Sequence, residues 1–106
     1  MPKYLITASY TPEGVKGLLK DGGTKRRQAA EAALKSVGGR VEAFYFALGE
    51  HDAVVIVDAP DNTTVASASM AINASGAVQT KTVALLTPEE IDQATKKSAS
   101  YQAPGR

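Results

Sequence analysis

The fold is decided by three consecutive segments: Arg40-Val-Glu-Ala-Phe-Tyr-Phe-Ala-Leu48, Gly49-Glu-His-Asp52 and Ala53-Val-Val-Ile-Val57. Two runs rich in Val, Ile, Phe and Tyr flank a short polar segment, which is typical of a β-hairpin. The second run is apolar at every position, as in a strand that is buried on both faces. We therefore predict a central hairpin whose second strand lies inside the fold.

The chain before the hairpin predicts one strand and a broken helical crossover. Lys3 to Tyr10 has the pattern of a strand that is again largely apolar on both faces. Pro12 to Val37 predicts two helical segments separated at Asp21-Gly22-Gly23, with Thr24 as the N-terminal cap of the second. The buried stripe expected for the first segment is Val15, Leu18 and Leu19.

The chain after the hairpin predicts a helix, a strand and a short final helix. Asp61 caps the first helix, which runs to about Ala74, and Ala77 to Leu86 has the alternation of a strand. Thr87 and Glu90 form a capping box that begins a short amphipathic helix. No charged residue occurs between Asp61 and Lys81, so the helix surface is either covered by something else or solvated by Ser, Thr and Asn.

The order of elements is βαββαβ, which predicts an α+β ferredoxin-like sandwich with its two crossovers on one face of the sheet. We expect a single domain over residues 1–97, including the short C-terminal helix, and a flexible tail over residues 98–106. Because the first and third strands are apolar on both faces, the second face needs a cover. A second copy of the chain is the simplest cover, giving a homodimer or higher oligomer.

Composition narrows the classes of partner. The chain has 106 residues, a net charge of +1, one His and no Cys. The near balance of charge argues against nucleic-acid and membrane partners, and no signal peptide or membrane span is expected. One His without Cys lacks the ligand spacing of a metal site, so we predict no metal and no cofactor. The default location is the cytoplasm.

Five segments of the chain are informative together: Tyr4-Leu5-Ile6, Ser9-Tyr10-Thr11, Gly22-Gly23-Thr24-Lys25-Arg26, Phe44-Tyr45 and Gly49-Glu50-His51-Asp52. In combination they resemble the GYD domain family of small bacterial proteins, whose function is uncharacterised. The resemblance covers nearly the whole chain and implies a ferredoxin-like domain of the dimeric α/β-barrel type. The family name refers to a Gly-x-Tyr-Asp turn, and this chain has His51 in place of that Tyr.

The first candidate site is the turn with Glu50, His51 and Asp52. Neighbouring carboxylates could make His51 a general base or a proton shuttle, and Tyr10 and Asp52 complete the candidate catalytic set. The alternative is a solvated polar turn, because hairpin turns recruit such residues anyway. Tyr45 is a further candidate for lining a cleft, although strand aromatics are also ordinary core residues.

The second candidate site is an anion site at the helix break. Lys25, Arg26 and Arg27 oppose the helix dipole in a first turn, and a phosphate or carboxylate bound there with Thr24 would reverse that cost. Alternatively, these long side chains swing into solvent. Asn73 is a further candidate ligand-binding residue, which could alternatively cap its helix locally or form a hydrogen bond across an interface.

Three classes of function follow from these features. The preferred one is a non-catalytic oligomeric module that binds a small ligand, which the helix break suggests is anionic, or a partner protein. The second is a dimeric α/β-barrel enzyme acting on a small polar or aromatic substrate, which rests on analogy of fold alone. The third is a purely structural assembly subunit, which would explain the uncharged helix.

Overall fold

The computed structural model describes residues 1–106 as four strands and four helices. The strands are β1 (Lys3–Tyr10), β2 (Arg40–Phe46), β3 (Ala53–Asp58) and β4 (Val78–Leu85). The helices are α1 (Pro12–Asp21), α2 (Gly23–Ser36), α3 (Asn62–Ala74) and α4 (Pro88–Thr95). The order and type of every element agree with those predicted from the sequence, with boundaries that differ by one or two residues.

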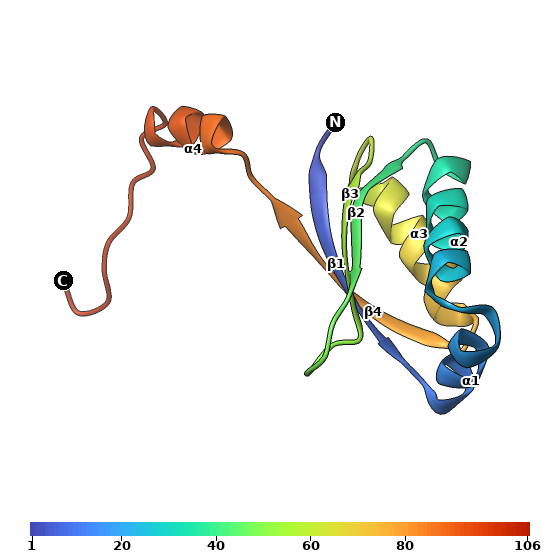
Figure 1. The fold of residues 1–106 in the computed structure, drawn as a ribbon. Helices are drawn as coiled ribbons and strands as arrows, with labels where there is room; N and C mark the ends of the chain where they lie inside the picture. The colour runs from blue at the N-terminus through green and yellow to red at the C-terminus, as the bar shows by residue number, and fades with distance from the viewer.

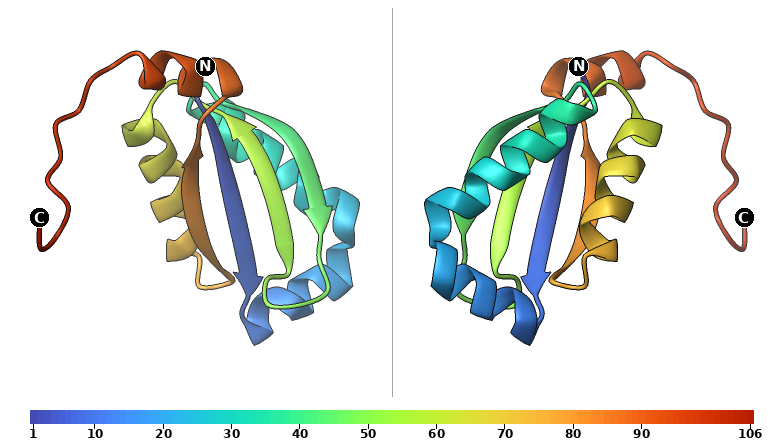
Figure 2. Two further views of the ribbon diagram at one scale, coloured as in Figure 1. Left: turned by 90° about the vertical axis from the view of Figure 1, so that its left-hand side faces the viewer. Right: turned by 90° about the vertical axis from the view of Figure 1, so that its right-hand side faces the viewer.

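The four strands form one antiparallel sheet in the order β2-β3-β1-β4. The crossover of α1 and α2 joins β1 to β2, and α3 joins β3 to β4. The chain is therefore of the α+β class, and its strand order is consistent with the predicted ferredoxin-like arrangement. Helices α1, α2 and α3 lie on the same side of the sheet, as Figures 1 and 2 show, and this side is called the helical face below.

The main core lies between the helical face and helices α2 and α3. It contains two central residues from each of β1 and β3, one residue of each helix, and Ala59 after β3: Tyr4, Ile6, Val55, Val57, Leu34, Val65 and Ala59. Phe44 of β2 packs against this cluster and also against a smaller one at the other end of the sheet. The core therefore contains alternate residues of β1 and β3, which are those that point toward the helices.

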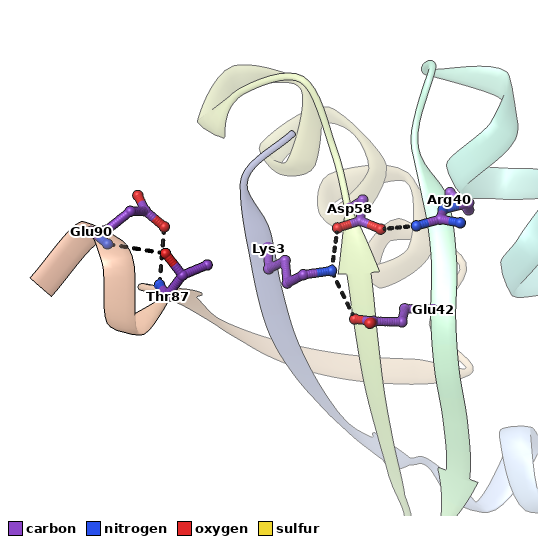
Figure 3. Close-up of polar contacts among 6 residues, drawn as sticks. All are labelled: Lys3, Arg40, Glu42, Asp58, Thr87 and Glu90. Atoms are coloured by element: carbon purple, nitrogen blue, oxygen red, sulfur yellow. Dashed lines mark hydrogen bonds and ion pairs between the residues drawn. The ribbon is translucent and has the colours of Figure 1, made fainter.

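Three helix starts have the capping chemistry expected from the sequence. The Thr11 and Asp61 side chains accept hydrogen bonds from the first turns of α1 and α3, at 3.2 Å and 2.8 Å. The predicted capping box of α4 is confirmed, with Thr87 and Glu90 exchanging hydrogen bonds of 3.0 and 3.1 Å, drawn in Figure 3. These contacts fix where each helix begins.

The prediction that Thr24 caps α2 is wrong. Gly22 precedes the helix with a φ of 82°, a conformation that glycine adopts without strain, and α2 begins directly at Gly23. Gly22 also ends α1, because its amide donates to the Leu18 carbonyl. One glycine thus turns the chain between the two helices, which leaves Thr24 exposed inside α2.

The predicted apolar stripe of α1 is also partly wrong. Leu18 is half-buried, but Val15 and Leu19 are exposed, and Gly14 is the buried residue of the helix. A Cβ at Gly14 would lie 2.0 Å from the Ala77 carbonyl oxygen. The start of α1 therefore approaches the start of β4 so closely that only a residue without a side chain fits there.

The end of the chain extends away from the sheet. Leu86 to Arg106, called the C-terminal arm below, lies on the side of the sheet opposite to α2 and α3 in Figure 1. The radius of gyration is 16.9 Å, whereas a compact chain of this length would have about 13 Å. None of the helices combines the length and apolar character needed to cross a bilayer.

Candidate functional site

The face of the sheet opposite the helices, called the open face below, is covered by no element of the chain (Figures 1 and 2). Its centre is apolar because Leu5 of β1 lies between Ile56 of β3 and Val83 of β4. The same face also carries Val54, Leu85, Ala43 and Tyr45. Leu5 and Ile56 are half-buried, and 55% of Val83 is exposed. A contiguous exposed apolar surface of this kind is typical of interaction sites.

A charged cluster borders the open face at one end. The Asp58 carboxylate lies between two cations, with the Lys3 amine at 2.8 Å and an Arg40 guanidinium nitrogen at 2.7 Å (Figure 3). Lys3 also contacts Glu42 at 3.1 Å. Only 4% of Asp58 is exposed, so its two partners supply the polar contacts that water would otherwise make. The cluster ties β1, β3 and β2 together at the edge of the apolar surface.

Sequence reasoning missed this cluster. Its members are far apart in the chain and come together only because Lys3, Asp58 and Arg40 occupy one line across the sheet register. The sequence did contain a signal for the cluster. Asp58 ends an apolar strand, and the basic residues Lys3 and Arg40 begin the two strands that pair with it. Charges directly opposite on neighbouring strands stabilise a sheet when their signs differ.

Protonation of Asp58 should therefore weaken the fold. Hydrogen bonds from Lys3 and then Arg40 hold the pKa of the Asp58 carboxyl below its ordinary value, despite burial. A carboxyl whose pKa is lowered on folding adds stability above its unfolded pKa of about 3.9, and this stability is lost as pH falls through the lower folded-state pKa. We expect Asp58→Asn to reduce the free energy of unfolding at neutral pH by about 2 kcal/mol.

The measurement is urea unfolding between neutral pH and the acid range. The Asp58→Asn variant should lose part of the acid dependence of the wild-type protein, so that the two curves converge at low pH. Glu42→Gln is the matched control, because it removes only an exposed contact and should change stability by less than about 0.5 kcal/mol. An unchanged pH dependence in Asp58→Asn would show that the cluster contributes no linked stability.

The structure separates the residues of the predicted turn site, because Glu50 and His51 lie in one place and Asp52 makes contacts in another. His51 and Glu50 line a polar hollow of about 270 Å³ at the other end of the open face. The hollow is completed by residues of β1 and β4: Thr7, Ser9, Gln79, Thr80 and Lys81. Its donors and acceptors border the apolar centre, opposite the end that holds Asp58. The role of His51 in proton transfer stays a prediction.

Asp52 points to a different contact. Its carboxylate accepts a hydrogen bond of 2.8 Å from the backbone amide of Tyr10, and its own amide donates to the Ala8 carbonyl at 2.8 Å. Asp52 thus connects the hairpin turn to the end of β1. This pairing depends on the register of β1 with β3, which the sequence pattern did not specify.

The helical face brings together two other predicted residues, Tyr10 and Arg26. Both line a cavity of about 100 Å³ between the sheet and helices α2 and α3, which is otherwise mostly apolar. Tyr10 therefore lies on the opposite side of the sheet from the His51 hollow. The sequence predicted that Arg26 belongs to an anion site at the helix break. In the structure Arg26 also lines an apolar cavity.

The remaining candidate residues lie apart from one another. Thr24 and Lys25 are exposed on α2, and Arg27 pairs with Glu31 one turn later at 3.7 Å. Tyr45 lies on the open face of β2, with 70% of its surface exposed. The roles of these residues as ligand contacts stay predictions.

Asn73 joins α3 to β4. Its side-chain oxygen accepts from the Thr80 amide at 2.8 Å, and its side-chain nitrogen donates to the Thr80 hydroxyl at 3.1 Å. Both contacts lie within one chain, where they hold the end of the helix against the sheet. They account for Asn73 without a ligand.

Comparison with known proteins agrees with the resemblance seen in the sequence. The GYD domain family matches residues 4–95, which include all of the sheet except Lys3 and the whole of α4. The chain belongs to the GYD domain family. A GYD domain thus supplies the open face, the turn with His51 and the cavity beside Arg26.

This GYD domain protein is also similar to a protein of Thermus thermophilus. That protein is named "Glutamine synthetase and cystathionine beta-lyase binding protein". The two are 31% identical over 83 residues, which cover 78% of this chain and 86% of the relative. The similarity therefore spans most of both proteins.

Proposed function

We propose that this GYD domain is a non-catalytic binding module that acts as a homodimer, with two open faces packed against each other. The observation that carries the proposal is the uncovered apolar centre around Leu5, Ile56 and Val83. Two sheets that pack face to face form a core about 10 Å thick from their facing side chains. Pairing of this kind corresponds to the dimeric α/β-barrel arrangement.

The layout of the open face fits an interface. Its apolar centre is bordered by the charged Asp58 cluster at one end and by the polar hollow with His51 at the other. An apolar centre with a polar rim is the usual anatomy of a protein interface. In a two-fold dimer the same patch serves both subunits, so Leu5 on one subunit would meet the same apolar centre on the other.

The C-terminal arm supports the same pairing. It extends on the side of the sheet where a second copy would lie, as Figure 1 shows. Apolar side chains of the arm are exposed in the single chain: Leu86, Ile91 and Tyr101. In the dimer these side chains would bury surface against the partner subunit, which would account for apolar side chains that are exposed in the single chain.

The residues predicted to be catalytic do not favour an enzyme. His51 lines the hollow on the open face, whereas Tyr10 lines the cavity on the helical face. The Asp52 carboxylate is occupied by the Tyr10 amide. General acid–base catalysis requires its groups within reach of one substrate, which these positions do not provide in a single chain.

A partner protein is the second part of the proposal. The name of the Thermus thermophilus relative describes binding to glutamine synthetase and cystathionine beta-lyase. By similarity, we propose that the dimer binds a metabolic enzyme of this kind. The outer side of α3 remains free in the dimer, and it is exposed and uncharged at Ala66, Ser67, Met70 and Ala71. A helix surface without charge is easily desolvated by a partner.

Two measurements test the module. Sedimentation equilibrium at low micromolar concentration should give twice the mass of the chain, and a stable monomer would contradict the dimer. Isothermal titration with purified glutamine synthetase and cystathionine beta-lyase should then detect binding that Ser67→Glu weakens. The control, Gln28→Glu, adds the same charge on the exposed side of α2 and should leave binding unchanged. Failure of both enzymes to bind would reject this class of partner.

A further inference from the structure

The cavity on the helical face is formed by residues from six elements. Its floor is the helical face of the sheet, with Ile6, Val55 and Phe44, and its walls come from α2 and α3, including Ala33 and Ile72. Figure 2 shows α2 and α3 at opposite edges of the sheet, with the strands visible between them. The cavity occupies this interval and is independent of the proposed dimer, which uses the open face.

Small side chains leave the cavity open. Helix α2 presents Ala29, Ala30 and Ala33 to it, at positions where a core helix usually carries Leu, Ile or Phe. Interiors are close-packed, so the apolar side chains that line this partly open cavity make fewer contacts than they would in a filled core. An apolar occupant would restore those contacts.

Arg26 gives the cavity a charged end. It is half-buried and has no acidic side chain within ion-pair distance, whereas its neighbour Arg27 pairs with Glu31. Tyr10 and Thr80 add hydroxyl groups to the lining. A guanidinium group binds a carboxylate through two parallel hydrogen bonds, and it does so more strongly where water is partly excluded.

We propose that this cavity binds a small aromatic carboxylate, with the ring among the alanine side chains and the carboxylate on Arg26. The volume of about 100 Å³ is of the order of the roughly 150 Å³ apolar cavity that admits benzene. Phe44 lines the cavity and offers a ring for an edge-to-face contact. An aromatic ring without a charge would leave Arg26 unpaired, and an anion without a ring would leave the apolar space empty.

The test uses benzoate, its neutral analogue benzamide, and acetate as an anion without a ring. Binding is followed by NMR from the methyl groups of Ile6, Val55 and Ile72 in the full-length protein. Benzoate should shift these signals and bind at least tenfold more tightly than benzamide, and acetate should not shift them. If benzoate leaves the three methyl signals unchanged at millimolar concentration, the cavity is not a site for this class of ligand.

Substitutions separate the charge from the cavity. Arg26→Gln should remove the preference for benzoate over benzamide, while the matched control Arg27→Gln on the same helix should keep it. Ala33→Leu should fill the cavity and abolish binding of both aromatic probes, and Ala30→Val serves the same purpose if the leucine variant does not fold. A preference for benzoate over benzamide that survives in Arg26→Gln, or binding of either aromatic probe to a folded cavity-filling variant, would overturn the assignment.

Discussion

Replacing Leu5 by lysine is expected to convert the protein from a dimer to a monomer. Leu5 lies at the centre of the open face, between Ile56 and Val83. In the proposed dimer the two lysines would lose their hydration without gaining an acidic partner. Each unpaired buried charge costs about 4 kcal/mol, so the two together should raise the dimer dissociation constant roughly a millionfold and leave the protein monomeric at micromolar concentration. Sedimentation equilibrium measures this directly.

The control for Leu5→Lys adds the same charge away from the open face. Ala32 is exposed on α2, on the other side of the sheet, so Ala32→Lys should leave the dimer intact. The monomeric Leu5→Lys variant should remain folded, because the core beneath the helices does not include Leu5. If Leu5→Lys dimerises as tightly as the wild-type protein, the open face is not the interface.

Replacing Gly14 by alanine is expected to produce the largest loss of stability of any single methyl group added to this chain. The new Cβ would lie 2.0 Å from the carbonyl oxygen of Ala77 and 3.0 Å from its carbon. The Ala77 carbonyl cannot move away freely, because it accepts a hydrogen bond of 3.0 Å from the Thr11 amide. We expect the free energy of unfolding to fall by about 3 kcal/mol, at the upper end of overpacking effects.

Gly17 provides a matched control on the same helix. A Cβ at Gly17 meets nothing within 4 Å. Gly17→Ala should therefore stabilise the protein by about 0.5–1 kcal/mol, because alanine favours a helix more than glycine does. Urea unfolding of the two variants should give changes of opposite sign. Equal changes would mean that helix propensity, rather than the contact with β4, governs both positions.

Local sequence signals were sufficient for the elements of the fold. The composition of the hairpin, the cap at Asp61 and the capping box at Thr87 each act over a few residues, and each has its expected place in the structure. The errors in the crossover came from contacts between distant segments. The position of α1 is set by the approach of Gly14 to Ala77, which periodicity within the helix does not reveal.

The candidate site was less predictable because it depends on pairing across the sheet. Neighbours in the turn separate in space: His51 lines the open-face hollow, whereas Asp52 binds the backbone of Tyr10. The charged environment of Asp58 needs the register of three strands. Arg26 was noticed as an unfavourable charge, but the cavity beside it exists only after several elements have packed.

The central place of β1 also determines when the sheet can form in the cell. β1 precedes the other strands along the chain, yet its two neighbours, β3 and β4, begin only at Ala53 and Val78. Its apolar residues leave the ribosome before either neighbour exists, and the strand is enclosed only after Leu85 has emerged. Pairing between such distant segments closes a long loop and is slow compared with helix formation. Until β4 has been made, the apolar strand β1 therefore stays accessible to chaperones and to other chains.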